Sequence, residues 1–137
     1  MQVLYPNFEK RDGLVTVVAQ EASTGQILMV ASTDPAGFEE TLRIGKAVYY
    51  STSRKERWMK GETSDNTQEV VGVLVDCDGD AVIYLVQQRG EGACHTGAES
   101  CFYRNVVAGA FVGEAPRAGK KEVLHFVDIE VHERFGR

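Results

Sequence analysis

Cysteine is scarce in this chain of 137 residues, which contains three, an odd number. Disulfide frameworks are built from paired cysteines in oxidising compartments, so this composition favours reduced thiols. Long apolar runs are also missing, and no stretch approaches the ~20 apolar residues that a membrane-spanning helix needs. The amino terminus has no basic segment followed by an apolar run, so we expect no signal peptide and a cytoplasmic location.

The chain has fewer basic than acidic residues: 15 Lys and Arg against 20 Asp and Glu, which gives a formal net charge of −5. An acidic chain binds nucleic acids and anionic membranes poorly, and we expect neither as a partner. A few local basic side chains still suffice to bind one phosphate group. The hydrophobic fraction of 43% is ordinary for a globular protein of this size. We therefore predict a single domain over residues 1–137.

Strand-like patterns predominate along the chain, and they are bounded by turn residues. The predicted strands are residues 14–19, 26–31, 47–50, 69–75, 81–88, 102–107 and 123–131. Residues 23–25, Ser-Thr-Gly, predict a hairpin turn between the first two strands. Residues 51–68 look like a functional loop with one helical turn. The pattern indicates an α+β domain with few helices and mostly antiparallel strands.

One helix is clear. Asp34 followed by Pro35 predicts its first turn, with the aspartate as N-cap. Gly45 is a natural end for it, because glycine readily adopts the left-handed conformation found after helices. We expect its apolar side to consist of Phe38, Leu42 and Ile44.

Three aspartates alternate at Asp76, Asp78 and Asp80. In extended structure alternate side chains share one face, so the carboxylates would converge and a hard divalent cation would relieve their repulsion. A calcium loop is excluded, because it requires Gly at its sixth position and Glu at its twelfth, where this chain has Ala81 and Gln87. A solvated polar turn is the competing interpretation, and the aspartates alone favour it.

Cys94 and Cys101 are seven residues apart. On a straight helix that separation is about 10 Å, too far for two sulfurs each ~2.3 Å from one zinc ion. The chain between them must bend for both to bind, and Thr96-Gly97 is a suitable place. Together with Cys77 they would make a three-thiolate zinc site with one position open for water, whose pKa zinc lowers towards ~7. Three buried thiols are the alternative.

His95 directly follows a candidate ligand, and a neutral imidazole there can take or give a proton. Glu62 and Glu99 are rivals for that role, because a partly buried carboxyl group can also titrate near neutrality. His125 and His132 lie in a strand-like tail, and we assign them structural roles.

Hydroxyl and basic side chains are dense between residues 51 and 64, and such donors suit a phosphate group. A solvated basic loop explains the composition equally well. The donors are Ser51, Thr52, Ser53, Arg54, Lys55, Arg57, Lys60, Thr63 and Ser64.

Taken together, these segments resemble the phosphoribosyl-AMP cyclohydrolase family. The signature-like blocks are KGETS at 60–64, DCDGDA at 76–81, ACHTG at 93–97 and SCFYR at 100–104. Residues 13–15, 24–29 and 49–54 fit the same family. The resemblance covers residues 8–105, a cyclohydrolase-like core, and leaves residues 106–137 as a C-terminal extension of unknown role.

The resemblance implies a hydrolase of histidine biosynthesis that opens the adenine ring of phosphoribosyl-AMP at its N1–C6 bond, a cyclic amidine. It implies a homodimer with metal sites at the interface. Zinc would be bound by Cys77 of one chain with Cys94 and Cys101 of the other, and His95 would be catalytic. Magnesium would be bound by Asp76, Asp78 and Asp80. The substrate-binding residues would be Ser51, Ser53, Arg54, Trp58, Lys60, Gly61, Glu62, Thr63 and Ser64.

Two departures from the family pattern concern the substrate. Residues 31–34 read Ala-Ser-Thr-Asp where the family usually has Ala-Tyr-Met-Asn, and Asp65 stands where Gly is usual. A cyclohydrolase with a shifted substrate is therefore one alternative. A zinc nucleobase or nucleotide deaminase is another, although its His-x-Glu and Pro-Cys-x-x-Cys signature is absent. A non-catalytic, zinc-stabilised binding protein is the third, with His95 closing a four-ligand site.

Overall fold

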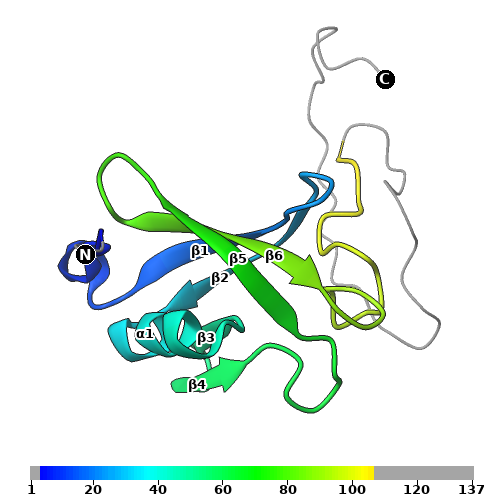
Figure 1. Ribbon diagram of the computed structural model, residues 1–137, viewed down its shortest axis with the longest axis horizontal. Helices are drawn as coiled ribbons and strands as arrows, with labels where there is room; N and C mark the ends of the chain where they lie inside the picture. The colour runs from blue at the N-terminus through cyan, green and yellow to red at the C-terminus, as the bar shows by residue number, and fades with distance from the viewer. Residues whose placement is uncertain (1–3, 107–137) are drawn as a thin grey trace, which may run out of the picture.

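The computed structural model describes residues 4–106 of the chain, and in this part a six-stranded sheet is accompanied by one α-helix (Figure 1). The strand order is β4-β3-β2-β1-β6-β5. The β1–β6 pair is parallel and the other pairs are antiparallel, which confirms the predicted α+β class with mostly antiparallel strands. The elements are η1 (Phe8–Arg11), β1 (Val15–Glu21), β2 (Ile27–Thr33), α1 (Pro35–Ile44), β3 (Val48–Ser51), β4 (Glu56–Met59), β5 (Gln68–Val75) and β6 (Ala81–Gln88).

The core lies on one face of the sheet, where the pleat directs every second side chain inwards. On β1 the residues Val15, Val17 and Ala19 are buried while their neighbours are partly exposed. On β6 the buried positions alternate in the same way, and Val17 pairs with Val82 across the parallel ladder. Both strands were predicted from their apolar, strand-like sequences, and their positions agree with the prediction to within two residues at each end.

Helix α1 begins and ends at the predicted residues. The Asp34 side chain accepts a hydrogen bond from the Gly37 amide at 2.8 Å, and Gly45 ends the helix with φ 75°. The predicted apolar side is only partly correct: Phe38 is buried, but Leu42 and Ile44 are 46% and 37% exposed. Instead, a buried threonine, Thr41, faces the sheet. Its hydroxyl donates a hydrogen bond to the Gly37 carbonyl and accepts one from the Val48 amide, so this buried polar group has hydrogen-bond partners within the protein.

The segment 51–68 was predicted as a loop with a helical turn, and this is wrong, because it contains strand β4. The strand forms a hairpin with β3 in which Tyr49 pairs with Trp58, and the two rings lie 5.2 Å apart between centroids. The Tyr49 hydroxyl in turn donates to Gln68 at the start of β5. Charged residues at Glu56 and Arg57 obscured the alternation on which the strand prediction depends.

The predicted strand at 102–107 is also wrong over its described part. Residues 102–106 are irregular apart from one bridge position at Arg104. The chain just before them is fixed to β2 by hydrogen bonds from the Ser100 hydroxyl to the Ile27 and Leu28 carbonyls and from the Cys101 amide to the Leu28 carbonyl. The predicted strand at 123–131, with both its histidines, lies outside the described residues. No helix in residues 4–106 has the length and apolarity needed to cross a membrane.

Asp34 and Asp65, one residue from each departure, have a conformational explanation. Asp65 has φ 63°, a left-handed backbone that glycine adopts freely and that aspartate tolerates better than most residues. Asp34, in place of the usual Asn, still serves as N-cap, because both side chains suit that position. The Thr33 hydroxyl, fully buried, donates to the Val48 carbonyl. The local backbone therefore accommodates both changes.

The left-handed conformation of Asp65 predicts an asymmetric response to substitution. Asp65→Val should lower the free energy of unfolding by about 1–2 kcal/mol, because a β-branched side chain is strained at positive φ. Asp65→Gly should cause no loss. Glu62→Val, at an exposed neighbouring position without positive φ, is the control and should change stability by less than about 0.5 kcal/mol. Urea unfolding measures all three, and equal losses at Asp65 and Glu62 would contradict the explanation.

Candidate metal centre and active site

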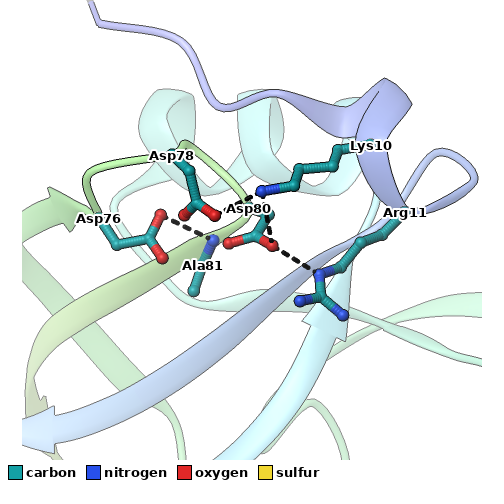
Figure 2. A network of polar contacts seen from close by, with 6 residues as sticks. All are labelled: Lys10, Arg11, Asp76, Asp78, Asp80 and Ala81. Carbon is teal, nitrogen blue, oxygen red and sulfur yellow. Dashed lines mark hydrogen bonds and ion pairs between the residues drawn. The ribbon is translucent and has the colours of Figure 1, made fainter.

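The turn between β5 and β6 brings three aspartates together (Figure 2). One carboxylate oxygen from each of Asp76, Asp78 and Asp80 lies within 4.8 Å of the others. The expected convergence is present, but it arises from a turn and not from extended structure. Gly79 has φ 80° in this turn, and the Asp76 carboxylate accepts a hydrogen bond from the Ala81 amide at 3.2 Å. Oxygen donors in this arrangement suit magnesium, whose opposite ligands are ~4.2 Å apart at Mg–O bonds of ~2.1 Å.

Two cations from η1 contact these carboxylates. The Lys10 ammonium contacts Asp78 Oδ2 and lies 3.5 Å from Asp80 Oδ2, and Arg11 Nε donates to Asp80 Oδ2 at 2.8 Å. The hydrogen bond from Arg11 is the main cause that lowers the pKa of Asp80 to about 2. The sequence analysis missed Lys10 and Arg11, because nothing in the sequence links them to a turn more than sixty residues away.

Two of the three cysteines lie together after β6. Cys94 is buried and Cys101 half-buried, and the chain reverses between them as expected, with the Gly97 amide donating to the Cys94 carbonyl at 2.9 Å. The Thr96 hydroxyl donates to Cys94 Sγ at 2.9 Å. Burial, reinforced by the neighbouring Cys94, raises the pKa of Cys101 to about 12. This thiol is therefore neutral at pH 7 unless a cation binds to it.

Lys60, in the segment after β4, lies close enough to this pair of thiols for them to affect its pKa. Burial lowers the pKa of Lys60, while its electrostatic interaction with Cys101 and Cys94 acts in the opposite direction. The Lys60 amide is fixed by a hydrogen bond to the Ala47 carbonyl at 3.0 Å. The fold thus brings together one of the predicted substrate-binding residues and two of the predicted zinc ligands.

Asn66 joins the 60–66 segment to the glycine-rich loop that carries Cys94. Its side-chain oxygen accepts a hydrogen bond from the Glu91 amide at 3.0 Å, and its carbonyl accepts one from Gln88 Nε2 at 3.1 Å. A Cβ at Gly90 would lie 1.9 Å from Asn66 Oδ1, and one at Gly61 would lie 2.4 Å from the Asn66 carbonyl carbon. The sequence analysis missed Asn66. The other candidates in this segment, Glu62, Thr63 and Ser64, are exposed.

Ser51, Ser53 and Arg54 lie at the opposite end of β4 from Lys60, and the strand itself is about 10 Å long. In the β3–β4 turn the Arg54 amide donates to the Ser51 hydroxyl, which lies 3.3 Å from the Ser53 hydroxyl. Trp58 is half-buried against Tyr49. Polar groups therefore lie at both ends of β4, and the ring of Trp58 lies between them.

Cys77 and His95 are both exposed, and they lie far apart. Cys77 is in the acidic turn, and the eight residues of β6, about 23 Å in length, separate it from the Cys94 loop. In Figure 1 the β5–β6 turn is at the upper left, while the yellow segment after β6 is on the right. Within residues 4–106 the three thiols do not form one cluster, and the close group of potential ligands is the aspartate triad. His95 occupies the tip of the turn between Cys94 and Gly97.

A polar cavity of about 280 Å³ borders the thiol loop. Glu99 and Glu91 line it from that loop, and Glu21 lines it from the end of β1. The Glu21 carboxylate is held there by the Gln88 amide at 3.0 Å. Of the three candidates for proton transfer, Glu99 is therefore the one that lines this cavity.

Comparisons with known proteins agree on one family. Residues 29–103 match the family model of phosphoribosyl-AMP cyclohydrolase. A phosphoribosyl-AMP cyclohydrolase from Nitratidesulfovibrio vulgaris (strain DP4) is 48% identical over 109 residues, which cover 80% of this chain and 86% of that protein. One from Haloquadratum walsbyi is 52% identical over 95 residues, covering 69% and 71%.

A longer relative is the histidine biosynthesis bifunctional protein HisIE of Deinococcus radiodurans. It is 48% identical over 128 residues, which cover 93% of this chain and 56% of that protein. Because 128 residues exceed the length of the region up to residue 106, this similarity continues into the C-terminal extension.

The contact between Gly90 and Asn66 predicts a measurable coupling. Gly90→Ala should lower the free energy of unfolding by about 2–4 kcal/mol, because the new methyl group meets Asn66 Oδ1 and the backbone has φ 77°. Gly13→Ala is the matched control, since φ is 88° there but no atom lies within 4 Å of the added Cβ, and it should cost about 1–2 kcal/mol.

The double variant Gly90→Ala with Asn66→Ala separates steric contact from backbone strain. Its loss of stability should fall short of the sum of the single losses by at least about 0.5 kcal/mol, because the clashing atom is gone. Additive losses in urea unfolding would mean that Asn66 does not hold the Gly90 loop.

Proposed function

The chain belongs to the phosphoribosyl-AMP cyclohydrolase family of hydrolases, and from this premise we propose that it opens the adenine ring of phosphoribosyl-AMP at the N1–C6 bond in histidine biosynthesis. The observation that carries the proposal is the packing of Cys94 against Cys101 within the region that matches the family, with Lys60 close enough for its pKa to be affected by both. A half-buried cation beside two thiols suits a site for metal and an anionic nucleotide.

Zinc is the metal that this donor set fits. Cys94 and Cys101 are neighbours, and a divalent cation would oppose the burial that keeps Cys101 protonated. When bound, zinc supplies a water molecule that is activated at neutral pH. The third sulfur, that of Cys77, lies across the length of β6 and cannot join from the same chain. We therefore propose a homodimer in which each zinc site takes Cys77 from the partner.

His95 is the proposed group for proton transfer. Opening the ring requires a proton to leave the attacking water and a proton to reach N1. The turn that presents His95 also contains Cys94, and it leaves the imidazole exposed to an incoming substrate. Glu99, which lines the neighbouring cavity, and Glu62, which is exposed, are the rivals.

The substrate contains two phosphate groups, one on the AMP part and one on the added ribosyl group. The donors at the two ends of β4 are suited to such a ligand, with Ser51, Ser53 and Arg54 at one end and Lys60 at the other. Magnesium, held by the aspartate triad, would position and neutralise a phosphate. The backbone at Asp34 and Asp65 accommodates these two residues.

Ring opening of phosphoribosyl-AMP by the purified chain, supplied with zinc and magnesium, tests this function directly. AMP is offered in parallel, because a deaminase would release ammonia from it. Turnover of phosphoribosyl-AMP without ammonia release supports the proposal. Ammonia release from AMP would indicate a deaminase, and binding of zinc and nucleotide without any turnover would indicate a binding protein.

Sharing of zinc between chains predicts complementation. Cys77→Ser and Cys94→Ser homodimers should each be inactive and depleted of zinc, because every site lacks one sulfur. A heterodimer of the two variants contains one intact site and one site that lacks two ligands. It should regain about half of the zinc and of the turnover, as measured by metal analysis and assay of isolated heterodimers. Absence of recovery would count against sharing.

The role of His95 predicts a loss of turnover without loss of metal. His95→Ala should keep its zinc but lose roughly 10²–10⁴-fold in kcat, the usual contribution of a general acid–base group. Glu99→Gln is the matched control and should keep most of the turnover. Should Glu99→Gln show the large loss and His95→Ala not, the proton-transfer role would belong to Glu99.

A further inference from the structure

We propose that Lys10 is the resident counter-ion of the aspartate triad and that a divalent cation binds there by displacing it. The inference rests on the magnesium site of the proposed function. It adds to that site Lys10 and Arg11, two residues of η1 that are not metal ligands. In Figure 2 the Lys10 side chain reaches from η1 to two of the three carboxylates. The Lys10 ammonium thus takes the place that a metal ion would occupy between these carboxylates.

The oxygens explain why Lys10 and a divalent ion compete. Lys10 Nζ contacts Asp78 Oδ2 and lies 3.5 Å from Asp80 Oδ2, so one ammonium bridges two candidate ligands. Magnesium would have to lie ~2.1 Å from such oxygens. An ion that close to both carboxylates would also be close to Nζ, and like charges at that separation repel strongly.

The charge balance leads to the same conclusion. Three carboxylates contribute −3, and Lys10 with Arg11 contributes +2, so the turn is nearly neutral before any metal binds. Adding a divalent ion without displacement would reverse the sign of the cluster. Releasing one ammonium to solvent keeps the cluster close to neutral.

Lys10, and not Arg11, is the cation that leaves. The Lys10 side chain is 42% exposed, and lysine has a flexible stem with a strongly hydrated charge that water readily accepts. Arg11 donates at 2.8 Å to Asp80, whose side chain is only 6% exposed and needs that partner. Arg11 therefore stays and keeps Asp80 in place while the metal enters.

Such an exchange has a consequence for the proposed zinc site. The acidic turn is also held by a hydrogen bond from the Asn7 amide to the Gly79 carbonyl at 2.7 Å. With Lys10 and Arg11 in place, the turn that carries Cys77 needs no magnesium to keep its shape. Magnesium and zinc are therefore expected to bind independently.

Titration with Mn²⁺, a probe for oxygen-rich magnesium sites, tests the exchange. The free ion is followed by its electron paramagnetic resonance signal, and Mg²⁺ is then added as competitor. Lys10→Met should bind Mn²⁺ at the turn about tenfold more tightly than the unchanged protein, because the competing ammonium is gone. Lys46→Met, the same charge change at an exposed position away from the triad, should stay within about twofold. Asp78→Asn should abolish the site.

Equal affinity in Lys10→Met and the unchanged protein would overturn the proposal, as would weaker binding in Lys10→Met or no binding in any variant. Exposed ion pairs contribute little to stability, so Lys10→Met should fold, and its thermal unfolding is measured alongside. The readout is ion binding and requires no turnover. Failure of the ring-opening assay with a positive exchange result would reject the proposed function alone.

Discussion

The antiparallel ladder between β5 and β6 is the constraint on which the arrangement of the site depends. It is a continuous hairpin with Val73, Tyr84 and Val86 packed on the core side, apart from one bulge near Val71. A paired strand has a fixed rise per residue, so the hairpin holds its two ends about 23 Å apart. The acidic turn with Cys77 lies at one end, and the thiol pair lies at the other. A zinc site with all three sulfurs thus requires a second chain.

Each end of this hairpin pairs buried anionic or acidic groups with a cation from a distant segment. At the acidic turn, Asp80 is ionised in a nearly buried position because Arg11 donates to it. At the thiol loop, Lys60 lies close enough to Cys94 and Cys101 for them to affect its pKa. Burial penalises a lone charge heavily and a paired one much less. The fold can therefore maintain both clusters without metal.

The loops of the site are held by close backbone packing more than by secondary structure. Gly61 and Gly90 both approach Asn66 too closely for any side chain. Lys60 precedes one of these glycines, and Cys94 follows the other by four residues. Fixing the two glycines against one asparagine therefore fixes the lysine relative to the thiols. Preorganisation of this kind lowers the entropic cost of binding a ligand.

The sequence by itself determined the features that depend on local chemistry. The β1, β2, β5 and β6 strands follow from short apolar runs bounded by turn residues, and α1 follows from Asp34, Pro35 and Gly45, because such runs and helix caps are set within a few residues. The resemblance to the family was also readable, because its blocks are contiguous. Strand β4 was not, since its stability comes from the Trp58–Tyr49 contact and not from its own pattern.

Tertiary structure alone decided which distant groups meet. Lys10 and Arg11 reach the aspartates across more than sixty residues, and Asn66 reaches Gly90 across twenty-four. Electrostatic and steric contacts act through space, and separation along the chain carries no information about them until the sheet order is known. Lys60 lies close enough to Cys101 and Cys94 for them to affect its pKa, while strand β6 keeps Cys77 at the opposite end of the hairpin. That separation follows from the rigidity of a paired strand, which no local pattern of residues reveals.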